Sequence, residues 1–135
     1  MDKRQKEREK IYNKYNGRCA YSGSRLKNDW QVDHLEPAIR NWWDNTIMNK
    51  EAQNEDNKVP SQKEINHYKS SMLLEDFRER MKTLHLRLAR LPKNPRVQRS
   101  IKRKKYMLKI AAYFNITENR PFDGEFYFEK VNKQT

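Results

Sequence analysis

The chain has 135 residues, 36% of them charged and 35% hydrophobic, which suits one domain with a small core. Its 30 Lys and Arg outnumber 18 Asp and Glu, giving a net charge of +12. Such an excess predicts a polyanionic partner, with nucleic acid first and an anionic membrane surface second. No apolar run reaches the ~20 residues of a membrane span. The charged start has no secretory signal, and one cysteine excludes an internal disulfide. A cytoplasmic protein is therefore expected.

The first part of the chain predicts a helix followed by a hairpin. Residues 2–16 form a charged segment with a short apolar stripe, and Gly17 is a suitable C-terminal stop for a helix. Residues 18–23 and 30–35 are strand-like and are separated by a polar turn. A hairpin between these two segments is the simplest interpretation.

The middle of the chain combines an aperiodic stretch, residues 38–56, with a helix start. Trp42 and Trp43 lie in this stretch and are expected to anchor it on the core, because bulky aromatic rings bury a large area. Residues 61–64, Ser-Gln-Lys-Glu, have the form of a capping box, in which both side chains accept hydrogen bonds from free amides. They predict a helix over residues 61–69.

Two long helices and a strand are predicted in the second half. The first helix is indicated by apolar residues at three- and four-residue spacing, which are Leu74, Phe77, Met81, Leu84, Leu88 and Leu91. Residues 97–114 predict the second helix, with core contacts at Ile101, Leu108, Ala111 and Ala112. Residues 126–128, Phe-Tyr-Phe, are expected to form a closing strand that packs in the core.

Positive charge is concentrated near the second long helix. From Arg90 through Ile116 there are nine Lys or Arg residues and no acid. The dense part consists of Arg96, Arg99, Lys102, Arg103, Lys104 and Lys105. One interpretation is a solvated helix face. The other is a surface that contacts phosphates, which the absence of any interleaved acid favours.

Four polar residues have the chemistry of phosphodiester hydrolysis, which requires a base to activate water and a cation to neutralise charge. Asp33 and His34 end a strand-like segment, Asn57 follows 23 residues after His34, and Asn66 follows nine residues later. Imidazole titrates near neutral pH, so His34 suits the base. Asp33 is expected to point to the other side of the extended chain. Its carboxylate and the Asn66 carbonyl offer hard oxygen ligands that suit Mg²⁺.

These segments resemble the HNH endonuclease family, the ββα-metal nucleases. The matching segments are residues 17–23, 32–34, 57–61 and 66–69, and residues 124–129 resemble the end of small phage and prophage members. The spacing is also similar to the HNH domain of the RNA-guided CRISPR effector. The resemblance implies one α+β domain over residues 1–135, with a ββα-metal (His-Me finger) core flanked by long helices. That core spans about 17–70, preceded by a helix over about 2–16 and followed by a helical extension with a closing strand over about 71–130.

The resemblance also implies a role for each polar residue. His34 is the general base, while Asp33 and Asn66 bind Mg²⁺, Mn²⁺ or another divalent ion. Asn57 positions the loop that carries His34. His67 is the alternative metal ligand, because family members can have histidine in place of the second asparagine.

Many relatives bind a structural zinc through two Cys-x-x-Cys pairs. The four corresponding positions here are Cys19, Ser22, Gln62 and Ile65. A tetrahedral zinc site needs four Cys or His ligands, so no structural zinc is expected. Cys19 is then expected to be a small buried residue, and packing by Ile65, Tyr21 and the long helices to replace the metal.

The expected function is a small metal-dependent endonuclease that hydrolyses DNA, held by the basic stretch on the phosphate backbone. Lys69 lies about one turn beyond Asn66 and is expected to contact the scissile or an adjacent phosphate, or else to be a plain surface lysine. The expected setting is a bacterial or phage-infected cell, with a homodimer or a larger phage or defence assembly left open. The alternative is a non-catalytic basic protein that binds DNA or RNA on an HNH-like scaffold. A membrane-surface role ranks last.

Overall fold

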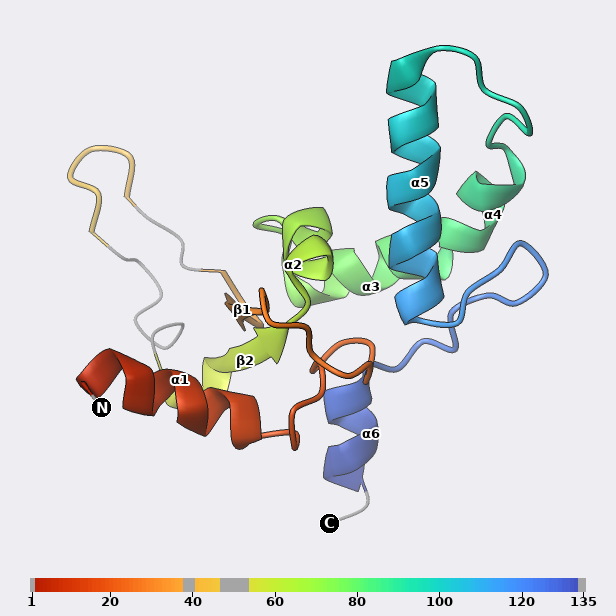
Figure 1. Ribbon diagram of the computed structural model, residues 1–135. Helices are drawn as coiled ribbons and strands as arrows, with labels where there is room; N and C mark the ends of the chain where they lie inside the picture. Colours follow the sequence, from red (N-terminus) through yellow and green to blue (C-terminus); the bar gives the residue numbers. More distant parts are fainter. Residues whose placement is uncertain (1, 38–40, 47–53, 134–135) are drawn as a thin grey trace.

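The computed structural model describes residues 2–37, 41–46 and 54–133, which form an arrangement of helices around a small sheet (Figure 1). The elements are α1 (Lys3–Asn13), β1 (Gln31–His34), η2 (Glu55–Asn57), β2 (Lys58–Ser61), α2 (Lys63–Lys69), α3 (Leu74–Lys82), α4 (Leu84–Ala89), α5 (Gln98–Tyr113) and α6 (Tyr127–Lys133). The prediction of an α+β fold is confirmed at this level. The expectation for residues 38–56 lies partly outside the described residues.

β1 and β2 are antiparallel neighbours, with residues 31–34 facing residues 61–58 in register. The predicted hairpin between residues 18–23 and 30–35 is therefore wrong. Residues 18–25 close on themselves instead, because the amide of Cys19 donates to the carbonyl of Ser24 and that of Gly23 donates to Cys19. β1 is left to pair with β2, and the fully buried Val59 attaches β2 to the core.

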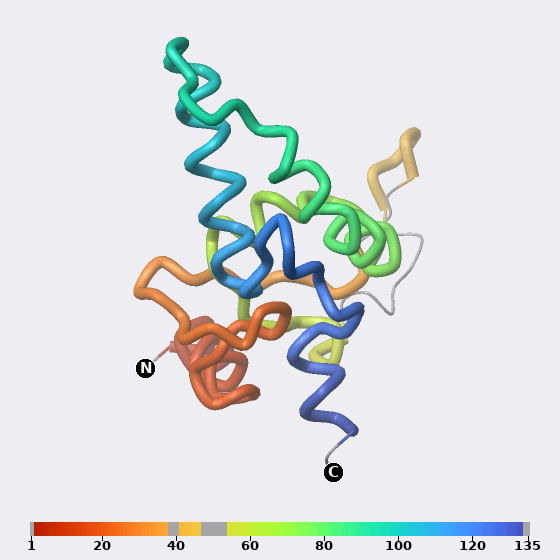
Figure 2. Tube along the Cα trace, turned by 90° about the vertical axis from the view of Figure 1, so that its right-hand side faces the viewer, coloured from red at the N-terminus to blue at the C-terminus, as the bar shows by residue number. Residues whose placement is uncertain are grey.

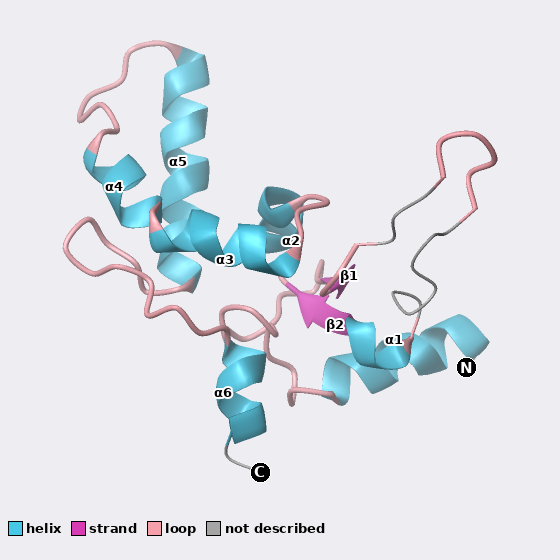
Figure 3. Cartoon of the chain, turned by 180° about the vertical axis from the view of Figure 1, so that it is seen from behind, coloured by secondary structure: helices cyan, strands magenta, loops and turns pink. Residues whose placement is uncertain are grey.

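The sheet lies between α1 and α2, and α3, α4 and α5 continue on the α2 side (Figures 1 and 3). β1, β2 and α2 thus form a ββα unit. A quarter turn of the molecule shows α5 rising away from the sheet, with its first residues at the opposite end from α1 (Figure 2). With 16 residues, α5 is about 24 Å long.

α1 is shorter than predicted and ends at Asn13. Its start is fixed by a capping box, in which Asp2 accepts from the amide of Gln5 and the Gln5 side chain accepts from the amide of Asp2. Gly17 has φ +78° and its amide donates to the carbonyl of Tyr12. A glycine in this left-handed conformation closes the turn after the helix, as its position in the sequence predicts.

The capping box predicted over residues 61–64 is wrong, because Ser61 belongs to β2 and α2 begins at Lys63. The Ser61 hydroxyl donates to the carbonyl of Gln62 at 3.0 Å. Glu64 forms an ion pair with Lys109 on α5 at 2.6 Å instead of reaching back to the helix start. The carboxylate therefore joins two helices rather than capping one.

The single long helix predicted over residues 74–91 is divided into α3 and α4 at Thr83, whose φ and ψ are −105° and 1°. Arg87 stabilises the break, donating to the Thr83 hydroxyl at 2.7 Å and to the carbonyl of Arg80 at 2.8 Å. Both halves still bury apolar side chains, including Phe77 and Leu84. Apolar side chains at three- and four-residue spacing therefore face the core on both sides of Thr83, although the helix is interrupted there.

α5 confirms the second long helix, but its buried face is rotated from the predicted one. Met107, Ile110 and Ala111 are buried, whereas Leu108 is 47% exposed. Residues 127–133 form α6 rather than a strand, although Phe126 and Phe128 lie in the core as expected. The packing that favours a helix here comes from outside the segment.

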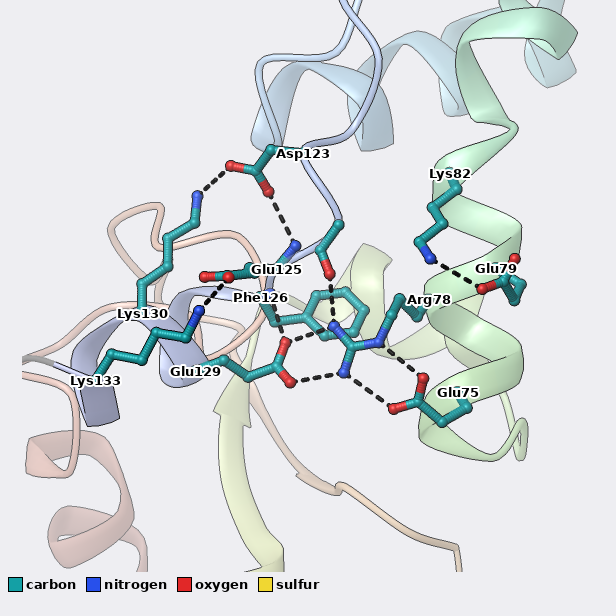
Figure 4. A network of polar contacts seen from close by, with 11 residues as sticks. Glu75, Arg78, Glu79, Lys82, Asp123, Glu125, Phe126, Glu129, Lys130 and Lys133 are labelled. Carbon is teal, nitrogen blue, oxygen red and sulfur yellow. Dashed lines mark hydrogen bonds and ion pairs between the residues drawn. The ribbon is translucent and has the colours of Figure 1, made fainter.

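Arg78 on α3 fixes the start of α6 (Figure 4). Its guanidinium donates to both carboxylate oxygens of Glu129 at 2.6 Å, to the carbonyl of Gly124 at 2.7 Å and to Glu75 at 2.9 and 3.1 Å. Glu129 in turn accepts from the amide of Phe126 at 2.9 Å. A helix places Glu129 three residues after Phe126 on the same side, and this geometry satisfies the bonds together.

Trp42 and Trp43 do not anchor their segment on the core. Their exposed fractions are 91% and 65%, and their rings contact each other edge to face at 5.7 Å. The turn over residues 41–46 is closed by its own hydrogen bonds, among them two between Asn41 and Thr46. The segment therefore forms without contributing its aromatic rings to the interior.

Candidate active site

Asp33 points from β1 towards α2 and is buried. Its Oδ2 atom accepts a hydrogen bond from the Tyr21 hydroxyl at 2.5 Å and lies 3.3 Å from Nζ of Lys69. Burial and the neighbouring carboxylate raise the pKa of Tyr21 well above its ordinary value. The phenol therefore stays protonated and donates to Asp33.

Lys69 is an internal partner of β1. Its side chain is 1% exposed, and its Nζ donates to the carbonyl of His34 at 2.9 Å as well as pairing with Asp33. The expected contact between Lys69 and a phosphate is wrong for this conformation, because the ammonium lies inside the protein. Two oxygen partners compensate a buried charge that would otherwise be costly.

Asn66 on α2 faces β1. Its Nδ2 donates to Oε1 of Gln31 at 2.7 Å, and alternate residues of a strand share a face, so Gln31 and Asp33 point the same way. His67 is exposed and contacts the ring of Tyr106 on α5, with 6.1 Å between centroids. Asn66 therefore faces β1, whereas His67 faces α5.

His34 points to the other side of β1, as the alternation of side chains along a strand requires. Its imidazole borders a hollow of about 370 Å³ between α1 and the sheet, which we call the α1 hollow. The charged and polar residues that line the α1 hollow are Arg4, Glu7, Arg8, Gln31, His34 and Lys58. Within the described residues the imidazole has no hydrogen-bond partner. Asp33, His34 and Asn66 therefore do not converge on one point in this conformation.

Asn57 braces the chain just after His34. Its Oδ1 accepts from the amide of Glu36 at 2.9 Å, and its Nδ2 donates to the carbonyl of Glu36 at 2.8 Å. Its own carbonyl accepts from the amide of Leu35 at 2.8 Å. These bonds fix the loop that leaves β1, which is the position that the resemblance implies for Asn57.

The side chains offer two oxygen atoms to a divalent cation. Oδ1 of Asp33 and Oδ1 of Asn66 have no hydrogen-bond partner among the residues that the structure describes. One charged and one neutral oxygen ligand suit Mg²⁺, which usually keeps several waters. In the same part of the chain no group of three His, Cys, Asp or Glu side chains is placed to hold a metal. Lys69 occupies the other oxygen of Asp33, which leaves the two Oδ1 atoms as the oxygen ligands that Asp33 and Asn66 can offer.

Two of the four positions that the sequence resemblance aligns with zinc ligands, Ser22 and Gln62, are linked by hydrogen bonds through Ser24. The side-chain Nε2 of Gln62 donates to the Ser24 hydroxyl at 3.0 Å and to the carbonyl of Arg25 at 2.7 Å. The Ser24 hydroxyl lies 2.6 Å from that of Ser22. Cys19 is fully buried, as expected for a small apolar residue. Gln62 thus connects α2 to the turn after α1.

The dense basic stretch lies on and just before the first turns of α5, at the end of that helix that is far from β1 (Figure 1). Five of its side chains are exposed, namely Arg96, Arg99, Lys102, Arg103 and Lys105. Lys104 is half-buried and donates to the carbonyls of Pro92 and Lys93 at 2.9 and 2.7 Å. Lys104 is therefore the least accessible member of this basic stretch.

Three cations that line the α1 hollow together with His34 come from α1 and β2 and are absent from the predicted site. Arg4, Arg8 and Lys58 all border the α1 hollow. The i, i+4 spacing of Arg4 and Arg8 places them on one helix face, and this spacing is visible in the sequence. What the sequence does not give is the packing of that face beside β1.

Comparisons with models of known protein families, with curated proteins and with solved structures return no match to this chain. Among the described helices, none has both the length and the apolar character needed to cross a membrane.

Proposed function

We propose that the protein is a divalent-metal-dependent endonuclease of the HNH type that hydrolyses phosphodiester bonds in DNA. The observation that carries the proposal is the ββα unit, in which Asp33 and His34 end β1, Asn57 braces the following loop and Asn66 faces β1 from α2. Gln31 borders the α1 hollow and also accepts from Asn66. Gln31 is therefore the residue that the α1 hollow shares with the α2 side of the sheet.

In this proposal each side chain has one task. The imidazole of His34 accepts a proton from the attacking water in the α1 hollow. Asp33 and Asn66 hold the metal through their Oδ1 atoms. When bound, a divalent ion neutralises charge on the phosphate and on the leaving oxygen. Asn57 keeps His34 in place, and the exposed cations of α5 contact more distant phosphates without reading sequence.

Metal dependence tests the proposal. Wild-type protein should nick supercoiled plasmid in Mg²⁺ or Mn²⁺ and leave it intact in EDTA. Asn66→Ala should abolish nicking, whereas His67→Ala, a matched change at the next position of the same helix, should retain most of it. Equal activity of the Asn66 and His67 variants would remove Asn66 from the metal site, and no nicking by wild type with any divalent ion would refute the function.

A second candidate function is a non-catalytic basic protein that binds DNA or RNA. It is favoured by Lys69, whose ammonium already neutralises Asp33. A bound divalent ion stabilises the native state by an amount that depends on its concentration relative to Kd. The endonuclease proposal thus expects Mg²⁺ or Mn²⁺ to raise the Tm of wild type but not of Asp33→Asn. Nucleic-acid binding without nicking and without a metal-dependent Tm would favour the second candidate.

A further inference from the structure

The α1 hollow has the charge and donors of an anion site. Counting Arg4, Arg8 and Lys58 against Glu7, its lining has a net charge of +2 with His34 neutral. Glu7 forms an ion pair with Lys58, whose Nζ lies 2.6 Å from the Glu7 carboxylate. The two arginines are not neutralised by any carboxylate in the described part of the chain. The unpaired positive charge therefore belongs to α1.

Arg8 is held in place while most of its donors remain unused. Its guanidinium lies 3.9 Å from the centroid of the Trp30 ring, and one nitrogen donates to the Trp30 carbonyl at 2.6 Å. A guanidinium has five N–H donors in a fixed plane. Stacking on a buried ring thus orients the remaining donors without consuming them.

Arg4 lies one turn before Arg8 on the same helix face and forms no hydrogen bond or ion pair with any described residue. An exposed arginine beside a second cation repels it unless an anion joins them. Guanidinium groups bind phosphate oxygens through paired N–H donors, which makes phosphate the matching anion. The i, i+4 pair therefore offers guanidinium donors from one helix face to a phosphate group.

We propose that Arg4 and Arg8 of α1 bind a backbone phosphate of DNA in the α1 hollow, beside the imidazole of His34. This inference rests on the proposed function for the role of His34, but it assigns a binding site that neither the basic stretch of α5 nor the HNH-like residues include. α1 then positions the strand to be cut, while α5 contacts the duplex elsewhere. Positioning by a fixed cation pair lowers the cost of bringing water and phosphate together.

The test compares two charge reversals on α1. Arg4→Glu alters the α1 hollow, and Lys6→Glu makes the same change in net charge on another face of the helix, at a residue that does not border the hollow. Binding to a short labelled DNA duplex is measured by anisotropy in EDTA over about 50–200 mM salt. Arg4→Glu should weaken binding roughly tenfold and reduce the slope of log K against log salt by about one. Lys6→Glu should change both much less.

The Tm of Arg4→Glu, Arg4→Gln and Lys6→Glu should equal that of wild type, because Arg4 is exposed and has no partner to lose. An unchanged Tm excludes unfolding as the cause of weaker DNA binding. Equal effects of Arg4→Glu and Lys6→Glu on affinity and slope overturn the phosphate site. If wild type never nicks DNA but the two variants still differ in binding, the endonuclease proposal fails and the phosphate site stands. If wild type nicks DNA and the variants do not differ, the phosphate site fails and the endonuclease proposal stands.

Discussion

At the scale of single residues, a buried ion pair between Asp33 and Lys69 joins β1 to α2. Charged side chains are almost never fully buried without a partner, so an exposed lysine is the natural expectation at position 69. The burial follows from α2 packing along β1, which places Nζ 3.3 Å from Asp33 and 2.9 Å from the carbonyl of His34. Such a contact joins residues far apart in the chain, and local patterns do not contain it.

Other residue positions followed from local rules. The alternation of a strand places Asp33 and His34 on opposite sides, as predicted. Asn57 bonds both backbone groups of Glu36, so its place at the loop after His34 agrees with the resemblance. The directions of the Asp33 and His34 side chains were therefore predictable, whereas the burial of Lys69 against Asp33 was not.

Removing the internal cation should destabilise the fold. Lys69→Met leaves Asp33 buried with only Tyr21 as a partner, and breaking a buried ion pair costs about 3–5 kcal/mol. Lys63→Met on the same helix, where the lysine is exposed, should change the free energy of unfolding by less than about 0.5 kcal/mol. Urea denaturation measures both variants, and similar values for the two would show that Lys69 is not an internal counterion.

At the scale of elements, helix existence was easier to predict than helix ends and pairings. The spacing of apolar residues indicated α3, α4 and α5, but the break at Thr83 depends on hydrogen bonds from Arg87 that spacing does not encode. β1 pairs with β2 across a long connection, whereas a hairpin with the preceding segment had a shorter loop in its favour. The short segment at 126–128 was ambiguous, because aromatic residues suit strands and cores alike.

The ion pair between α3 and α6 predicts a pH dependence of stability. Partial burial opposes ionisation of Glu129, but hydrogen bonds from Arg78 and from the amide of Phe126 outweigh it and lower the pKa of Glu129 below its usual value of 4.5. The folded state therefore binds fewer protons than the unfolded state in this range. The stability from this pair is present above about pH 4.5 and is lost as the pH falls through the lower pKa of the folded protein.

Glu129→Gln should therefore reduce the free energy of unfolding by a constant amount from about pH 5 to pH 7, and by a shrinking amount below about pH 4.5. Denaturant unfolding at a series of pH values measures the difference from wild type. Glu118→Gln, at an exposed glutamate without an ion-pair partner in the described residues, provides the control. A difference for Glu129→Gln that stays constant down to pH 3 would contradict the assigned pair.

At the scale of the whole molecule, the net charge of +12 is divided between separate surfaces. One is the exposed basic stretch around the start of α5, and the other is the α1 hollow, which His34 borders. Figure 1 shows that α1 and the start of α5 lie far apart. Composition indicated a polyanionic partner, and the run of basic residues indicated the first surface. The second surface was not predictable, because it depends on how α1 packs against the sheet.

Reversing the exposed cations of α5 should weaken DNA binding without altering the site at His34. The combination Lys102→Glu, Arg103→Glu and Lys105→Glu leaves Lys104 and its bonds to two carbonyls in place. Each lost phosphate contact lowers the slope of log K against log salt by about one, so a decrease of about three is expected. Anisotropy titrations at several salt concentrations measure the slope, and an unchanged slope with an unchanged Tm would exclude α5 from the DNA-binding surface.

The most direct test of the central claim is the rate at which supercoiled plasmid is first nicked in Mg²⁺ or Mn²⁺ by wild type, His34→Ala and His67→Ala. A positioned general base contributes about 10²- to 10⁴-fold to the rate. The account predicts a loss of at least this size for His34→Ala, with unchanged Tm and DNA affinity, and near wild-type nicking for His67→Ala. Nicking by folded His34→Ala at the wild-type rate would contradict the account.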